Sequence, residues 1–267
     1  MDYLAKKNAH PRDANIVFDE GPHIYTINGD SNYMSVTTWN HSHFPEFDAD
    51  IVIDKMMCSN KWPQSKYFGK SKEEIKAEWE ETGRIAREEG TRMHHNIECF
   101  YNGVAIPEEE KNTQEFKYFQ EFAKDFSHLT PFRTEWMIYD EQLKFAGSVD
   151  MVFQTPNGTL EIYDWKRSKD IKRYNPFQSG LTECVRHIPD CNFYHYSLQL
   201  NTYKAILEKN YQVKIDALYL VCLHPNNENH SYIRIPCEDM TKEVQCLFDY
   251  RLLTRGECNN GTVILLK

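Results

Sequence analysis

The chain has 267 residues, of which 40% are hydrophobic and 13% aromatic, a composition that predicts a folded globular protein with a full core. Its net charge of −9 argues against a protein that coats nucleic acid through a generally basic surface, but it leaves room for local contacts. We find neither an apolar run of the roughly 20 residues needed to span a membrane nor a signal-peptide pattern. These features predict an intracellular protein and leave open a cytoplasmic, nuclear or viral-host compartment.

The first part of the chain predicts several short elements. An apolar-alternating hairpin turns at residues 20–22, and residues 48–57 have a helical pattern. A stronger helix begins at Ser71, which forms a Ser-x-x-Glu capping box with Glu74. We expect Gly83 and Gly90 to separate it from a second helix that ends near Tyr101. Residues 1–85 are therefore interpreted as an extension packed on a core of residues 86–267.

The second part of the chain predicts an α/β core. Residues 113–127 repeat phenylalanines at helical spacing, and three strands follow at about 132–139, 143–154 and 159–166. A helix over 194–209, a buried strand over 214–224, a helix over 241–253 and a short tail strand over 262–267 complete the chain. With no internal repeat and no linker, we expect one domain.

The eight cysteines are predicted to be reduced and mostly buried. None forms a Cys-x-x-Cys pair, so a zinc ribbon is not expected, and a disulfide framework does not suit a chain of this length.

The second and third strands bring charged side chains to one end of a hairpin. A three-residue loop over 156–158, with Gly158 left-handed, pairs Thr155 with Thr159. This register sets Asp150 opposite Asp164, and strand alternation sets Lys166 on the same face as Asp164. Two carboxylates repel unless a cation lies between them. The group is either a structural ion cluster or a site for Mg²⁺ or Mn²⁺, where the lysine would orient a water or offset charge on a phosphate.

An acid followed by Asp-x-Lys resembles the core of the PD-(D/E)XK nucleases, and three further segments resemble the RecB-like branch. These segments are GTRMHHNIE (90–98), AGSVD (146–150) and QLNTY (199–203). Residues 23–39 are similar to the N-terminal part of viral and phage RecB-like exonucleases, and the mitochondrial genome maintenance exonuclease has a similar layout. Val149 replaces the proline of the eponymous pattern. The resemblance implies an αβββαβ core with a mixed sheet flanked by helices.

The resemblance also implies roles for individual residues. His94, Asp150 and Asp164 would bind metal together with the carbonyl of Trp165, and Lys166 would assist the attacking water. Gln199 and Tyr203 would position the lysine and the nucleic-acid backbone. We expect one or two ions of Mg²⁺ or Mn²⁺, and a neutral imidazole favours Mn²⁺.

Several positions keep two interpretations. His95 rivals His94, but the spacing from residues 90–91 selects His94 and sets Glu98 one turn later on the same face. Glu98 and Glu135 are candidates for a second metal, although Glu135 is equally well an exposed strand acid. Glu161, Tyr163 and Trp165 lie on the opposite face of their strand and should be structural.

The remaining candidate residues concern the nucleic acid. Ser35 and Thr37 either contact phosphates or cap the helix after Val36, and we favour capping. The run over 166–173 is either a solvated loop or the element that holds a strand against the site. Its candidate DNA-binding residues are Arg167, Lys169, Lys172 and Arg173.

The function expected from this reasoning is a metal-dependent exonuclease that acts on DNA ends, prefers single strands and works in replication, recombination or repair. Any helicase or recombination partner would be a separate chain, because no helicase motif is present. Two alternatives stay open: an endonuclease that acts on DNA or RNA, and a non-catalytic protein that binds nucleic acid on a nuclease scaffold.

Overall fold

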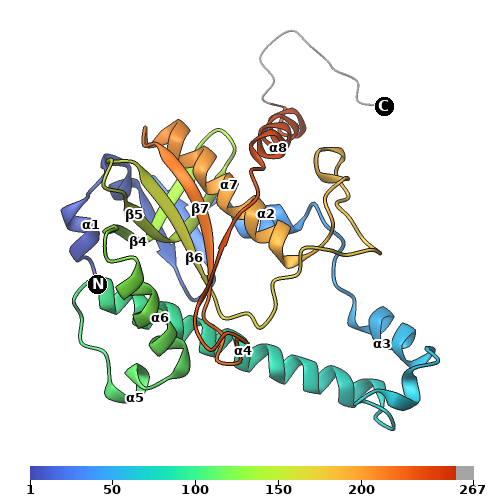
Figure 1. Cartoon of the computed structure of the whole chain (residues 1–267). Helices are drawn as coiled ribbons and strands as arrows, with labels where there is room; N and C mark the ends of the chain where they lie inside the picture. The colour runs from blue at the N-terminus through green and yellow to red at the C-terminus, as the bar shows by residue number, and fades with distance from the viewer. Residues whose placement is uncertain (257–267) are drawn as a thin grey trace.

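The computed structural model describes residues 1–256, and Figure 1 shows helices packed around a central sheet. The helices are α1 (Tyr3–Lys7), α2 (Val36–His41), α3 (Ala49–Met57), α4 (Lys72–Tyr101), α5 (Glu108–Lys111), α6 (Gln114–Asp125), α7 (Asn192–Asn210) and α8 (Thr241–Thr254), with short 3-10 turns η1 (Pro11–Asn15), η2 (Trp62–Gln64) and η3 (Glu183–Val185). The strands are β1 (Ile16–Asp19), β2 (Ile24–Ile27), β3 (Met34–Ser35), β4 (Thr130–Asp140), β5 (Phe145–Gln154), β6 (Leu160–Lys166), β7 (Ile215–Cys222) and β8 (Ile233–Pro236).

The six-stranded sheet mixes parallel and antiparallel pairs. Its order is β3-β5-β6-β7-β8, and β4 also pairs with β5. The pairs β3/β5 and β6/β7 are parallel, and the other pairs are antiparallel. The order α4-β4-β5-β6-α7-β7 confirms the predicted α/β core with a mixed sheet flanked by helices.

Strand β5 has an open stretch along one edge. Because β4 pairs along the whole length of β5, β3 and β6 must share the other edge. There β3 pairs with Phe145 and Ala146, and β6 pairs from Met151 to Gln154. Residues 147–150 of β5 therefore lie between the two neighbours without a ladder partner on that edge, at the position where the sequence predicts the first acid.

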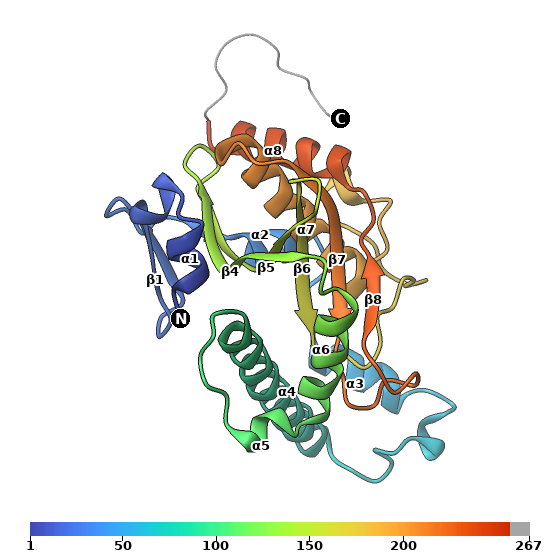
Figure 2. The same cartoon turned by 60° about the vertical axis from the view of Figure 1, so that its left-hand side comes forward.

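Helices cover both faces of the sheet (Figures 1 and 2). The core on one face includes side chains of α2, α7 and α8, and the core on the other includes side chains of α4 and α6. In β6, Ile162 belongs to the first core, and Tyr163 and Trp165 belong to the second. Asp164 and Lys166, which are in phase with Ile162, therefore face α7.

One prediction about helices is wrong: α4 is a single helix of 30 residues that continues through Gly83 and Gly90. Glycine costs only about 1 kcal/mol in a helix, and the predicted capping box of Ser71 and Glu74 is present at the start. Arg84 also forms ion pairs with Glu81 and Glu88 one turn away on either side. Residue 85, the expected boundary between extension and core, lies inside this helix.

The first half of α4 and the chain before it project from the main body, as Figure 1 shows at its lower right. We call residues 45–80, which include α3, η2 and the start of α4, the arm. Lys72 and Lys76 of α4 pair with Asp50 of α3, which holds the two helices together.

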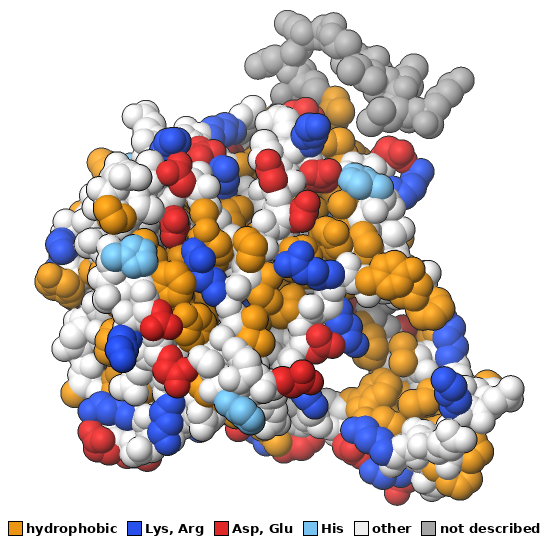
Figure 3. Space-filling model, in the orientation of Figure 1, with side chains coloured by type: hydrophobic (Ala, Val, Ile, Leu, Met, Phe, Trp, Pro, Cys, Tyr) orange, Lys and Arg blue, Asp and Glu red, His pale blue; other side chains and the backbone are white. Residues whose placement is uncertain are grey.

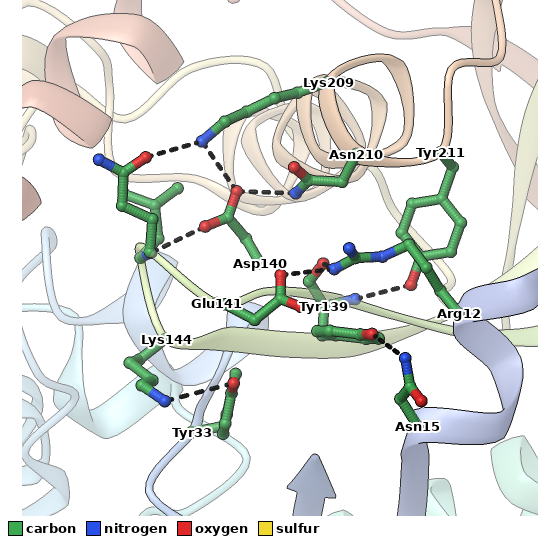
Figure 4. A network of polar contacts seen from close by, with 12 residues as sticks. Arg12, Asn15, Tyr33, Tyr139, Asp140, Glu141, Lys144, Lys209, Asn210 and Tyr211 are labelled. Atoms are coloured by element: carbon green, nitrogen blue, oxygen red, sulfur yellow. Dashed lines mark hydrogen bonds and ion pairs between the residues drawn. The ribbon is translucent and has the colours of Figure 1, made fainter. Parts of the chain in front are cut away.

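Residues 1–33 pack against β4. The β1–β2 hairpin turns where it was predicted, with Asp19 opposite Ile24. Figure 4 shows the polar contacts of this region: the Arg12 guanidinium donates to the carbonyl of Tyr139, and Asn15 donates to the Tyr139 hydroxyl. On the other side, Lys209 and Asn210 of α7 donate to Asp140. The N-terminal segment and α7 are therefore both attached to the end of β4.

The cysteine prediction is wrong at one pair, since Cys184 of η3 and Cys246 of α8 form a disulfide. The two residues are 62 positions apart, so only the fold brings them together. Cys99, Cys191 and Cys222 are free and buried, as expected.

The predicted tail strand over 262–267 lies outside the described residues. No helix within residues 1–256 is both long and apolar enough to cross a lipid bilayer.

Candidate active site

The predicted hairpin register is present. Val152 pairs with Ile162, the Thr155 amide donates to the Thr159 carbonyl at 2.8 Å, and Gly158 has a φ of 84°. Beyond the last ladder pair, an Asp150 carboxylate oxygen accepts a hydrogen bond from the Trp165 amide at 3.0 Å. The Asp150 side chain thus occupies the unpaired edge of β5 and is joined to β6 directly.

A histidine and two acids meet at this point. His94 Nδ1 lies 3.5 Å from Asp150 Oδ2 and 3.7 Å from Glu135 Oε1. One ligand atom from each of the three residues can be chosen so that all lie within 4.8 Å of one another. His94 Nε2 lies 2.9 Å from the carbonyl oxygen of Trp165. Four predicted site residues, on α4, β4, β5 and β6, are therefore neighbours.

The charges of this cluster favour a cation. Burial opposes protonation of His94, but the carboxylates of Asp150 and Glu135 outweigh it and raise the pKa of His94 to about 9. Burial also raises the pKa of Asp150, and Glu135 adds to that shift. A protonated imidazole thus lies where a metal ion would balance the same two acids.

Glu135 has an unusual backbone. Its φ is 42°, a left-handed conformation that costs a non-glycine residue about 1–3 kcal/mol. The pairs Thr134–Met151 and Trp136–Val149 on either side set Glu135 opposite Asp150. Ser148 donates to its carboxylate at 2.8 Å. Of the two interpretations of Glu135, the geometry favours a site residue, because the strained backbone brings its carboxylate to His94.

Asp164 and Lys166 form the second part of the site. Asp164 is only 3% exposed, and Lys166 Nζ lies 2.5 Å from its Oδ2. Burial would lower the pKa of Lys166, but the carboxylates of Asp164 and Asp150 raise it, so the lysine stays charged. Burial and nearby Asp150 raise the pKa of Asp164 to about 6, against the effect of Lys166. The partner of Asp164 Oδ2 within the described residues is therefore the Lys166 ammonium.

Tyr196 is a site residue that the sequence reasoning missed. Its ring centroid lies 4.5 Å from Lys166 Nζ, in a cation–π contact. It comes from α7, three residues before Gln199 and thus on a similar face of the helix. This spacing is the only sequence signal that could have identified it.

Gln199 and Tyr203 connect α7 to the start of β5. The Gln199 amide donates to the hydroxyls of Thr37 and Tyr203, each at 3.0 Å. The Tyr203 ring lies against Gly147, where a Cβ would be only 2.7 Å from a ring carbon. Ser35 caps α2 by accepting from the Thr38 amide, which confirms the favoured interpretation of this residue.

The basic run divides into an internal and an exposed part. Arg167 pairs with Glu89 of α4 and with Glu115 of α6, and its side chain is 14% exposed. The sequence expected it on the DNA-binding surface, but these partners hold it within the protein. Lys169, Lys172 and Arg173 are exposed. The positive charge available to a ligand therefore begins three residues after Lys166.

A hollow of about 450 Å³ opens next to His94 and includes Glu98 and Glu135 in its lining. Burial and the neighbouring charge of Glu135 raise the pKa of Glu98. His95 also borders the hollow, but it is exposed, and its ring contacts the Cys99 thiol at 3.6 Å rather than the acids. Glu98 and Glu135 thus line the same hollow, and the charge of Glu135 acts on Glu98.

The opposite face of β6 is structural, as expected. The Trp165 ring packs edge-on against Phe119 and Phe122 of α6. Glu161 accepts a hydrogen bond from the Tyr163 hydroxyl at 2.9 Å.

The donor set fits a divalent cation such as Mg²⁺ or Mn²⁺. Carboxylate and carbonyl oxygens are hard ligands, and a single imidazole is compatible with Mn²⁺. His94, Glu135 and Asp150 would hold an ion, with the carbonyl of Trp165 beside them, and Asp164 stays a predicted ligand.

The chain matches the family model of the PD-(D/E)XK nuclease superfamily over residues 70–249, which is more than half of its length and includes His94, Glu135, Asp150, Asp164 and Lys166. A crystal structure of a candidate exonuclease from Eubacterium rectale is similar over 88% of this chain and 85% of that chain, with 12% sequence identity and a TM-score of 0.37. No curated protein sequence matches. Nucleases of the superfamily hydrolyse phosphodiester bonds and use divalent metal ions. The chain belongs to the PD-(D/E)XK nuclease superfamily.

Proposed function

We propose that this protein is an exonuclease of the RecB-like branch that degrades single-stranded DNA from an end. The observation that carries the proposal is that α4, which supplies His94, also forms one side of the arm. We infer that a strand reaches the metal site by passing between the arm and the main body. A free end enters such a passage more readily than a closed circle does.

The chain's own residues suit hydrolysis of a phosphodiester. A bound divalent ion would lower the pKa of a water and polarise a phosphate oxygen. Lys166, charged and fixed by Asp164 and Tyr196, can orient the attacking water or offset negative charge on the phosphate. Tyr203 and Gln199 hold the backbone of β5 beside Asp150, so that this acid keeps its position.

The loop after Lys166 suits a single strand. Phe177 and Tyr174 are 90% and 70% exposed and lie beside the exposed Lys172 and Arg173. Asn175 fixes this turn, because it accepts from the Phe177 amide and donates to the Asp190 carbonyl at 2.6 Å. Exposed aromatic rings next to cations stack on unpaired bases and contact the phosphates. We assign this loop to the strand near the site.

The test is a time course on the linear and the circularised form of one single-stranded oligonucleotide, at fixed low salt with Mg²⁺ and then with Mn²⁺. We expect the linear form to shorten progressively and the circle to survive. Equal rates on the two forms would instead support the endonuclease alternative. A parallel reaction with EDTA should show no cleavage, and cleavage that continues there would refute the metal mechanism.

The same assay addresses the remaining alternatives. An RNA oligonucleotide of the same sequence tests the substrate class, and we expect it to be degraded more slowly than DNA. Binding without cleavage under every metal condition would identify a non-catalytic protein. We place the activity in replication, recombination or repair, where a separate helicase or recombination protein would supply the single-stranded ends.

A further inference from the structure

The arm carries a basic and aromatic surface that the metal site does not use. Between residues 55 and 70 the chain has four lysines and no acidic residue, within a protein of net charge −9. All four lysines are exposed. We call residues 55–70 the arm tip, and its lysines are Lys55, Lys61, Lys66 and Lys70.

The positive charge of the arm tip is largely available. Lys70 pairs with Glu78 of α4, but Lys55 and Lys61 have no ion pair within residues 1–256. The acids of α3 just before the arm tip are paired with lysines of α4, Asp54 with Lys72 and Asp50 with Lys72 and Lys76. A negatively charged partner is therefore favoured at the arm tip.

One aromatic ring of the arm tip lines a hollow, and a second ring lies close to the first. The hollow measures about 520 Å³, and its lining includes Lys55, Lys61 and Trp62. Phe68, which is 58% exposed, lies with its ring centroid 5.9 Å from that of Trp62. Figure 3 shows apolar and basic side chains together on this lobe at its lower right, and the surface is hollowed between the lobe and the main body.

The arm tip is bonded to α4, the helix that supplies His94. The Trp79 indole of α4 donates to the Tyr67 hydroxyl at 2.8 Å, which fixes the arm tip to the start of that helix. Trp79 and His94 are 15 residues apart on α4, or about 22 Å along its axis. The arm tip and the metal site are therefore two separate places on one rigid element.

We propose that the arm tip is a second binding site for single-stranded DNA, which holds the substrate about 22 Å from the metal site along α4. Phosphates contact Lys55 and Lys61, and a base stacks on Trp62. The partner class rests on the proposed function. Lysines alone would suit any polyanion, but lysines interleaved with aromatic rings suit unpaired bases best. Two-point attachment would keep a shortening strand bound between cleavage steps.

The experiment measures binding without metal, so it does not depend on cleavage. The wild type and a Lys55→Glu/Lys61→Glu variant are titrated into a fluorescent oligothymidylate of about 30 nucleotides in EDTA, at several salt concentrations. The matched control is Lys124→Glu/Lys242→Glu, which changes two exposed lysines on α6 and α8. A separate Trp62→Ala variant tests stacking, and thermal melting checks that all variants are folded.

We expect the arm variant to bind about tenfold more weakly than the wild type and to lower the salt slope by roughly 1.4, since each phosphate contact to a single strand contributes about 0.7. The control should keep the wild-type affinity. The proposal is overturned if the arm variant and the control bind alike, if the wild type does not bind the oligonucleotide, or if only binding to anionic lipid vesicles is lost. Cleavage by the wild type with Mg²⁺ reports on the proposed function independently of all three results.

Discussion

At the scale of single residues, the side chains of β6 alternate between two faces, so that the candidate site residues lie on one face and the core residues on the other. Asp164 and Lys166 face α7 and pair with each other, whereas Glu161, Tyr163 and Trp165 face α6 or bond among themselves. Removal of one partner from a buried ion pair leaves an uncompensated charge, so each change should have a large effect.

We predict that Asp164→Asn and Lys166→Ala each lower kcat by at least about a thousandfold, because they act on the phosphate and its water. Glu161→Gln should change kcat by less than about threefold. Steady-state rates on a linear oligonucleotide measure the effects, and circular dichroism checks the fold. Similar losses in all three variants would contradict the assignment of faces.

The two adjacent histidines should differ. His94 contacts Asp150, Glu135 and the carbonyl of Trp165. The ring of His95 instead contacts the thiol of Cys99. They point about 100° apart around α4. His94→Ala should abolish cleavage and weaken Mn²⁺ binding, measured by titration calorimetry, and His95→Ala should retain both. The reverse ranking would transfer the ligand role to His95.

At the scale of elements, the contact between β5 and α7 fixes the site. Residues 147–150 have no ladder partner on the edge that they present to β3 and β6, where Asp150 accepts from the Trp165 amide, and α7 packs on the face of β5 beside this stretch. The Tyr203 ring lies on Gly147, and its hydroxyl accepts from Gln199. The glycine is required for a close approach, not for its φ.

Gly147→Ala should therefore lower stability by about 1–3 kcal/mol, because the new methyl group overlaps a buried ring. It should also lower kcat, since Tyr203 must move away from the edge that holds Asp150. Urea denaturation and the oligonucleotide assay measure the two effects. The double variant Gly147→Ala/Tyr203→Leu should recover part of the stability and none of the activity. Wild-type behaviour of Gly147→Ala would show that the ring can shift without consequence.

At the scale of the whole molecule, α2, the loop before α7 and α8 meet at His43. His43 is 4% exposed, and its ring forms a hydrogen bond of 2.8 Å with the Thr182 hydroxyl. The backbone carbonyl of His43 accepts a hydrogen bond from the Leu181 amide. Burial, with a smaller contribution from Arg251 of α8, lowers the pKa of His43 to about 4. The disulfide between Cys184 and Cys246 closes the same region.

This shift predicts a pH-dependent stability. The unfolded chain takes up a proton on His43 as the pH falls below about 6.5, and the folded chain does so only near pH 4. The stability that the neutral ring provides is therefore complete above pH 6.5 and is lost as the pH falls towards 4. Urea denaturation at pH 7.5 and 5 should show a smaller loss for His43→Asn than for the wild type. Parallel pH profiles of the two proteins would contradict a buried neutral imidazole.

The hairpin register and the order of the core elements follow from local rules of the sequence. Turn chemistry at Gly158 and strand alternation are local rules, so they predicted the register that places Asp150 next to Asp164 and Lys166. Helical spacing likewise placed Gln199 and Tyr203 on one face of α7. The continuity of α4 was missed, because glycine breaks a helix only when capping and ion pairs do not offset its cost.

The distant residues that join the site could be identified only from the way the folded chain packs. Glu135 approaches His94 through a left-handed backbone, Tyr196 lies over Lys166 from another element, and Arg167 is held by Glu89 and Glu115. The disulfide joins positions 62 residues apart. None of these follows from periodicity or turn type, because each depends on how β4, α4, α7 and α8 pack around the sheet, and packing is set by the shapes of all the side chains together.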